Sequence, residues 1–468
     1  MSAPVRNAPD TTVWREVGAP LVPATATGPL TGHTVAVKDL FAVAGYPLGA
    51  GVGDFLAGRA PEPRHATVVA ALLAAGADLT GIATTDEFAY SITGGNGRTG
   101  MPVNPAAPQR VPGGSSSGPA VAVARGEASI GLGTDTAGSI RVPGAYQGLW
   151  GIRTTHGSLD TTGLLPLAPS FDTIGWLARD ADTLAAVADA VFAARQAPAD
   201  RSRSAPDTPP DGRRIGGVRS ATTDFGARAA ASGAAGAADG SSVAPELGPA
   251  ASRPAGARSR AAAAPRVPGA VERTEPGRFV VDPALCAAAP SSAEQCLRAA
   301  RELGAAPVAL GAELDRWFGA FRTVQAYEAW AAHGDWIVAH PGALETEVAD
   351  RFAWAATVTD EGAAAARNLV AQASARITDA VGDGVLLLPT TAGPPPYRDA
   401  AARTRDAART ATLRLTCLAA IAGLPAVTLP LPRCGGLPIG LCMLGAAHTD
   451  HALIGLAARC APALTGSA

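Results

Sequence analysis

The chain has 468 residues, a formal net charge of −2 and a pI near 6.4. This length suffices for a large hydrophobic core, in one big domain or in two smaller ones. A nearly neutral chain has no general attraction for a polyanion, so we do not expect nucleic acid as a partner. The six cysteines have no CxxC spacing and are typical of buried thiols in a reducing compartment.

The sequence shows no sign of a membrane segment. Its first residues lack the apolar core of a signal peptide, and the longest apolar stretch, around residues 418–431, is interrupted by Gly423 and Pro425. We therefore expect a cytoplasmic protein without a membrane partner.

Short apolar runs alternate with alanine-rich stretches between about residues 30 and 200. Residues 34–37 (TVAV) and 78–83 predict two strands, and residues 65–75 predict a helix between them. This alternation favours the α/β class.

Lys38 ends the first of these strands and is the only lysine among the 38 lysine and arginine residues. A guanidinium stays protonated, whereas a desolvated lysine amine can lose its proton near neutral pH. Its position at a strand end therefore predicts a catalytic base, in preference to a leftover surface charge.

Two glycine-serine loops supply candidate nucleophiles. Residues 113–118 (GGSSSG) contain Ser115, and residues 133–141 (GTDTAGSIR) contain Ser139; each loop precedes a helix-forming run. The first loop resembles a phosphate cradle, but it lacks the Gly-Lys-Ser/Thr ending and the GxGxxG pattern of nucleotide sites. Small residues before Ser139 let backbone N–H groups converge on one point, as an oxyanion hole requires.

A nucleophilic serine needs a base to remove its proton, and the seven histidines offer no obvious partner. His156, the nearest of them, lies in a predicted loop. The economical solution is that one serine attacks the substrate while the other relays the proton to Lys38.

Residues 201–276 consist mainly of alanine, glycine, proline, serine and arginine. This composition predicts a disordered surface insertion in a single domain formed by residues 1–200 and 277–468, although a linker between two domains also fits the pattern. Beyond it, residues 385–388, 426–431 and 439–444 predict strands, and residues 407–421 and 451–461 predict helices.

These motifs resemble the amidase signature family. Residues 113–143 resemble its signature and residues 36–39 (AVKD) its lysine motif; the similarity extends to residues 170–175, to residues 423–426 and to nearly all of the chain outside 201–276. The resemblance implies an α/β fold with a large mixed β-sheet covered by helices on both faces. Within the family, the chain looks most similar to the branch of the indole-3-acetamide hydrolases.

The resemblance also implies roles for individual residues. Ser139 matches the nucleophile, Ser115 the bridging serine and Lys38 the base of a Ser-Ser-Lys triad, with a cis peptide bond leading into Ser115. The oxyanion hole would be formed by the backbone N–H groups of Thr136, Ala137, Gly138 and Ser139.

The nucleophile turn has two further features. Asp135 and Arg141 flank the turn, and we expect them to form a buried pair that holds the loop. Ala137 stands where the family usually has a glycine, which adds only a methyl group.

The activity implied by the resemblance is that of a serine amidase, which cleaves a small primary amide to a carboxylic acid and ammonia through an acyl-enzyme. We expect no metal and no organic cofactor, the small-molecule amide as the partner, and a chain compatible with a homodimer. The alternatives are a catalytic subunit of an amidotransferase complex, a ureido-acid (allophanate or biuret-type) hydrolase, a nucleotide-binding protein and an inactive scaffold. Tyr327, Trp330 and Trp336 either are core residues on a helix or line the pocket, and the second case favours aryl or apolar acyl groups.

Overall fold

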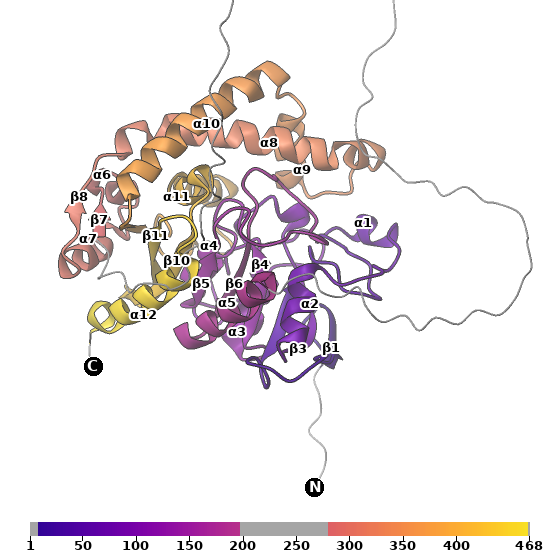
Figure 1. The fold of residues 1–468 in the computed structure, drawn as a ribbon. Coiled ribbons are helices and arrows are strands. Elements are labelled where there is room, and N and C mark those ends of the chain that lie inside the picture. Colours follow the sequence, from indigo (N-terminus) through magenta and orange to yellow (C-terminus); the bar gives the residue numbers. More distant parts are fainter. Residues whose placement is uncertain (1–7, 197–278, 467–468) are drawn as a thin grey trace, which may run out of the picture. The chain divides into compact units, whose positions relative to one another are not determined.

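The structure is a computed structural model that describes residues 8–196 and 279–466 (Figure 1). These described residues belong to one compact unit. The segment 201–276, which the sequence predicts to be an insertion, lies outside the described residues. The structure has the α/β fold with a large mixed sheet that the sequence predicts.

Eleven strands of the described residues form one sheet in the order β1-β3-β2-β4-β6-β5-β10-β11-β9-β7-β8. The sheet is mixed, because β2 runs parallel to β3 and β4 whereas β4 and β5 run antiparallel to β6. The strands are β1 (Trp14–Val22), β2 (Thr34–Lys38), β3 (Asp78–Ala83), β4 (Ile130–Thr134), β5 (Trp150–Arg153), β6 (Ile174–Ala178), β7 (Phe279–Val281), β8 (Ala306–Pro307), β9 (Val385–Pro389), β10 (Ala426–Cys434) and β11 (Leu437–Gly445).

Two hydrophobic cores lie on opposite faces of this sheet. In β9, Val385 and Leu387 belong to one core and Leu386 and Leu388 to the other, because successive side chains of a strand point to opposite faces. The core of Val385 also contains residues of α2 (Thr67–Ala74), α5 (Ala181–Gln196), α7 (Ala293–Glu302) and α12 (Asp450–Thr465). The core of Leu386 contains residues of α8 (Leu314–Ala339), α9 (Thr346–Ala355), α10 (Asp360–Val381) and α11 (Ala402–Ala422).

Helices therefore cover both faces, and α8 and α10 lie side by side over one of them (Figure 1). The remaining helices are shorter: α1 (Gly53–Ala57), α3 (Ser117–Arg125), α4 (Arg141–Gln147) and α6 (Pro283–Ala287), with two 3-10 turns, η1 (Glu87–Ala89) and η2 (Gly311–Glu313). No helix in the described ranges is long and apolar enough to cross a membrane.

The strands and helices predicted from apolar runs are confirmed with small changes of bounds. The run at 34–37 is β2, the run at 78–83 is β3, and the helix between them is α2. The predicted strands of the second half are β9, β10 and β11, and the predicted helices lie within α11 and α12.

Candidate active site

Lys38 is placed by the alternation of β2. Val35 and Val37 of this strand belong to the core that contains α2, whereas Ala36 packs against α3 on the other face. Lys38 is two residues beyond Ala36 and shares its face. The strand β4 runs parallel to β2 as its neighbour, so that Thr134, at the end of β4, lies at the same edge of the sheet.

The amine of Lys38 is fully buried and is held by two hydroxyl groups. Its Nζ donates hydrogen bonds to Ser115 Oγ and to Thr134 Oγ1, each over 2.8 Å. Burial lowers the pKa of Lys38 to about 7, against the carboxylates of Asp86 and Asp172, which raise it. A large fraction of the amine is therefore neutral near pH 7 and has a free lone pair.

Ser115 lies in the loop that leads into α3, and its peptide bond with Gly114 is cis, as the resemblance implies. Thr85 Oγ1 donates a hydrogen bond to the Ser115 carbonyl over 2.9 Å. A Cβ atom on Gly114 would lie 2.6 Å from Asp86 Oδ1, so this position requires a glycine. The loop thereby brings the Ser115 hydroxyl to Lys38, as predicted.

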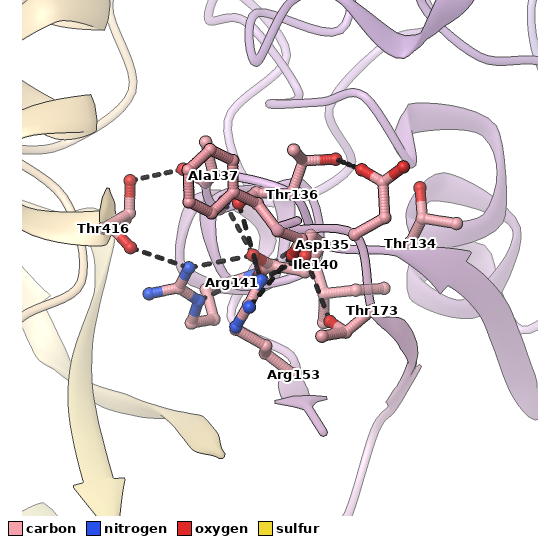
Figure 2. Close-up of polar contacts among 12 residues, drawn as sticks. Thr134, Asp135, Thr136, Ala137, Ile140, Arg141, Arg153, Thr173 and Thr416 are labelled. Carbon is pink, nitrogen blue, oxygen red and sulfur yellow. Dashed lines mark hydrogen bonds and ion pairs between the residues drawn. The ribbon is translucent and has the colours of Figure 1, made fainter. Parts of the chain in front are cut away.

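Ser139 occupies the turn between β4 and α4, which is organised by a buried ion pair. Arg141 Nε and Nη2 donate to the Asp135 carboxylate over 3.0 and 2.8 Å, and neither side chain is exposed to solvent (Figure 2). Arg153 Nη1 lies 3.4 Å from the same carboxylate. Burial would raise the pKa of Asp135, but the two arginines hold it well below its usual range. The expected pairing of Asp135 with Arg141 is confirmed.

Neighbouring side chains fasten the turn on two sides. Thr136 Oγ1 donates to Asp172 Oδ1 over 2.6 Å, and Thr416 Oγ1 of α11 donates to the Ala137 carbonyl (Figure 2). The Thr416 carbonyl in turn accepts a hydrogen bond from Arg141 Nη2 over 2.9 Å. The backbone of the turn is therefore fixed before any substrate arrives.

The four N–H groups predicted for the oxyanion hole differ in their availability. The N–H of Gly138 donates to Asp135 Oδ1 over 2.8 Å. In the described part of the chain, the N–H groups of Thr136, Ala137 and Ser139 donate no hydrogen bond. Three of the four groups are thus free for a ligand, whereas that of Gly138 is already engaged; the role of all four in catalysis stays a prediction.

The turn of Ser139 is linked to the loop of Ser115 through the backbone. The Ser139 carbonyl accepts a hydrogen bond from Ser116 N–H over 3.3 Å, which joins the two serine loops. No hydrogen bond between the hydroxyls of Ser115 and Ser139 occurs among the described residues. The structure therefore brings Lys38 and Ser115 into contact and joins their loop to the turn of Ser139, whereas the triad itself stays a prediction.

A small cavity of about 30 Å³ opens next to Ser139. Three parts of its lining are the nucleophile turn (Thr136, Ala137 and Ser139), apolar side chains (Ala89, Ile92, Leu167 and Leu413) and polar side chains (Tyr90, Ser91, Gln325 and Arg409). The aromatic candidates on α8 do not line it, which favours the first of the two readings, core residues, for Trp336. Tyr327 donates its hydroxyl hydrogen bond to Asp360 over 2.8 Å at an exposed position, and Trp336 packs edge-on against Phe55 and Phe88.

Four contributors to the site were not identified from the sequence. Thr134 lies in the stretch 133–141 and Asp172 in the stretch 170–175, both of which resemble the family's motifs. Their place in these motifs was the signal that could have identified them. Arg153 and Thr416 gave no signal, because a lone arginine at a strand end and a threonine in a helix read as surface residues.

Comparison with known proteins agrees with this geometry. The model of the Amidase family matches residues 17–225. Amidase 1 of Oryza sativa subsp. japonica is 51% identical over 159 residues, which are 34% of this chain and 37% of the relative. A glutamyl-tRNA(Gln) amidotransferase subunit of Halobacterium salinarum is 43% identical over 166 residues, 36% of this chain and 39% of that protein.

A solved chain from a protein complex linked to the origins of an s-triazine catabolic enzyme has 25% identity and a TM-score of 0.71, covering 93% of this chain and 84% of its own. The family match covers less than half of the chain, whereas the likeness in fold extends over 93% of it. The chain aligns with only 27–39% of the length of these curated relatives.

Proposed function

We propose that the protein is a serine amidase, a hydrolase that converts a small primary amide to a carboxylic acid and ammonia. The observation that carries the proposal is the buried Lys38 amine, hydrogen-bonded over 2.8 Å to Ser115 beside the turn of Ser139. A base whose pKa is near the working pH is the most effective proton acceptor for a hydroxyl nucleophile.

The proposed first step is acylation. Neutral Lys38 accepts the proton of Ser115 while Ser115 takes that of Ser139, whose oxygen attacks the amide carbon. The ammonium form donates to both hydroxyls. Once neutral, the amine has two N–H groups and one lone pair, so it can keep its donation to Thr134 Oγ1 while the lone pair accepts a hydrogen bond from the Ser115 hydroxyl. The proton returns along the same path to the leaving nitrogen, and ammonia departs.

The negative charge that develops on the amide oxygen needs donors that are already in place. The free N–H groups of Thr136, Ala137 and Ser139 are the proposed donors. Asp135 has no chemical step of its own, because its charge is fully engaged by Arg141 and Arg153. A water molecule then attacks the acyl-enzyme, with its proton passed to Ser139 as the ester bond breaks.

Ammonia release from a panel of primary amides tests the proposal. Wild-type protein should release ammonia, and Ser139→Ala should abolish the release. Ser117→Ala is the matched control, because Ser117 is equally buried and only two residues from Ser115. Release by Ser139→Ala that equals wild type would refute the assignment of the nucleophile.

The similarity to the amidotransferase protein supports a second candidate, the catalytic subunit of an amidotransferase complex. Such a subunit would use the same residues but would work together with partner chains. Purification of the tagged chain from its own cells, followed by the ammonia assay, separates the two. A chain that is active alone favours the amidase, whereas activity only with copurified partner chains favours the complex. Allophanate in the substrate panel tests the ureido-acid alternative.

A further inference from the structure

Two polar side chains in the cavity beside Ser139 take no part in the proposed chemistry. Gln325 comes from α8 and Arg409 from α11, and both line the cavity together with Ser139. Helices far apart in the sequence thus bring an amide and a guanidinium to the same small space.

Gln325 is the less easily explained of the two. Its side chain is only 8% exposed, and its amide makes no hydrogen bond within residues 8–196 and 279–466. The amide belongs to the lining of the cavity, where a ligand can reach it. A ligand group in the cavity would satisfy this amide.

Arg409 is only partly satisfied. Its Nε and Nη2 both donate to Asp406 Oδ1, over 2.9 and 2.7 Å, while its Nη1 has no partner in the described chain. The Arg409 side chain is 14% exposed, whereas that of Asp406 is 61% exposed. Solvent therefore screens the ion pair on the side of Asp406, and the guanidinium retains donors for a second anion.

The lining of the cavity carries an excess of positive charge. It contains no carboxylate, and its other ionisable side chain, Tyr90, stays neutral because burial raises its pKa to about 12. Arg351 lies close by and donates to the Tyr90 carbonyl over 2.8 Å. Burial and then the charge of Arg409 lower the pKa of Arg351, whereas Glu347, which lies 3.4 Å from Arg351, and Asp86 raise it. Arg409 and Arg351 therefore repel each other, and Glu347 offsets part of this repulsion. An anion in the cavity would relieve this repulsion.

We propose that Arg409 and Gln325 bind the carboxylate of an amide substrate whose carbonyl carbon lies at Ser139. The substrate class is then the monoamides of short dicarboxylic acids, with the methylene groups lying along Ile92, Leu167 and Leu413. The inference rests on the proposed amidase function and specifies its acyl group.

The test compares kcat/KM by ammonia release for malonamate, succinamate and glutaramate with that for the neutral butyramide, pentanamide and hexanamide. Wild type should prefer the best anionic amide over its neutral counterpart by at least about 10-fold, as expected for a hydrogen-bonded charged group. Arg409→Gln should lower kcat/KM for that anionic amide by about 10- to 100-fold, mainly through KM, and leave the neutral amides nearly unchanged. Gln325→Leu should act in the same direction.

Arg403→Gln is the control, since Arg403 lies exposed on the same helix and the variant removes the same charge. A measurement on wild type alone guards against misfolded variants: succinate should inhibit hydrolysis of a neutral amide competitively, and added salt should weaken the inhibition. Neutral amides turned over as well as the anionic ones, with no inhibition by succinate, would overturn the carboxylate site but leave the amidase standing. Failure of every amide, phenylacetamide included, would overturn the amidase proposal itself and this inference with it.

Discussion

Thr134 Oγ1 lies 2.8 Å from Lys38 Nζ, the same distance that separates this amine from Ser115 Oγ. The two hydroxyls come from different elements, the end of β4 and the loop before α3, and both are buried. Thr134 thus accepts one N–H of the amine and fixes the direction of the amine's remaining N–H and lone pair. A structural threonine of this kind positions the base without touching the substrate.

Replacement of Thr134 by valine should therefore lower turnover and change its pH dependence. The hydroxyl stabilises the ammonium form, so its loss lowers the pKa of Lys38 and moves the acidic limb of the pH profile to lower pH. A less well oriented base should reduce kcat by about 10- to 100-fold. The measurement is kcat against pH for wild type and Thr134→Val.

Thr390→Val is the control for this change, because Thr390 and Thr428 share a buried hydrogen bond of 2.9 Å away from Lys38. This control should reduce the free energy of unfolding by about 1 kcal/mol and leave the pH dependence of kcat unchanged. An unchanged profile in Thr134→Val would show that Thr134 has no influence on the base.

Lys38→Arg should be as inactive as Lys38→Ala, with kcat at least about 100-fold below wild type, because a guanidinium does not give up its proton. Wild-type activity should rise with pH through about 7, as the amine becomes neutral. Steady-state kinetics of the three proteins between pH 5 and 9 checks both statements. An active arginine variant would remove lysine from the mechanism.

The same amine should make folding stability depend on pH. The folded pKa of about 7 lies below that of a free lysine, about 10.4. Between these values the unfolded chain binds the proton and the folded chain does not, so wild-type stability rises with pH relative to Lys38→Met. Below about pH 7 the difference between the two proteins should be constant. Urea unfolding at several pH values measures this difference, and parallel curves from pH 7 to 10 would contradict a buried neutral amine.

Covalent labelling should distinguish the two serines. A fluorophosphonate reacts with an activated serine, so Ser139→Ala should lose both labelling and turnover, whereas Ser115→Ala should lose most turnover and retain slow labelling. Intact-protein mass spectrometry measures the adduct. The reverse pattern, with an adduct in Ser139→Ala and none in Ser115→Ala, would exchange the two roles.

Asp135→Asn should destabilise the fold as well as stop turnover. The change keeps the shape of the side chain but leaves Arg141 and Arg153 buried without their counter-charge, at a cost of about 3–5 kcal/mol. Asp450→Asn is the matched control, since Asp450 is a buried carboxylate that accepts two hydrogen bonds from Thr155 and, among the residues that the structure describes, pairs with no arginine. It should cost less stability and leave kcat near wild type. Urea unfolding and ammonia release report the two effects, and equal losses in both variants would contradict a special role of Asp135.

The sequence predicted the part of the site that depends on local pattern. An apolar β-branched run ending in Lys38 is readable as a strand, and small residues around Ser115 and Ser139 are readable as tight turns. The irregular strand β1 was not found, because its nine residues include charged residues and Pro20 and lack strict alternation. Periodicity also gave no sign that Trp336 packs on Phe88 instead of lining the cavity, since both arrangements bury the same helix face.

Contacts between distant segments could not be predicted at all. Arg153 reaches Asp135 only because β5 and β4 both pair with β6, and nothing in the local sequence marks this arginine as buried. The cavity side chains Gln325 and Arg409 meet for the same kind of reason, through the packing of α8 and α11. Sequence pattern specifies the elements, but which charged side chains come together depends on the order of strands and helices.

Helix α11 supplies two residues of the cavity wall and an anchor of the nucleophile turn. Arg409 and Leu413 are one turn apart and face the cavity, and Thr416, almost one turn further on, bonds the Ala137 carbonyl. Positions 409 and 413 can therefore be randomised together in a directed-evolution library while Thr416 keeps the reactive turn in register. Substitutions at these two positions would thus change the substrate preference and leave the reactive groups unaltered.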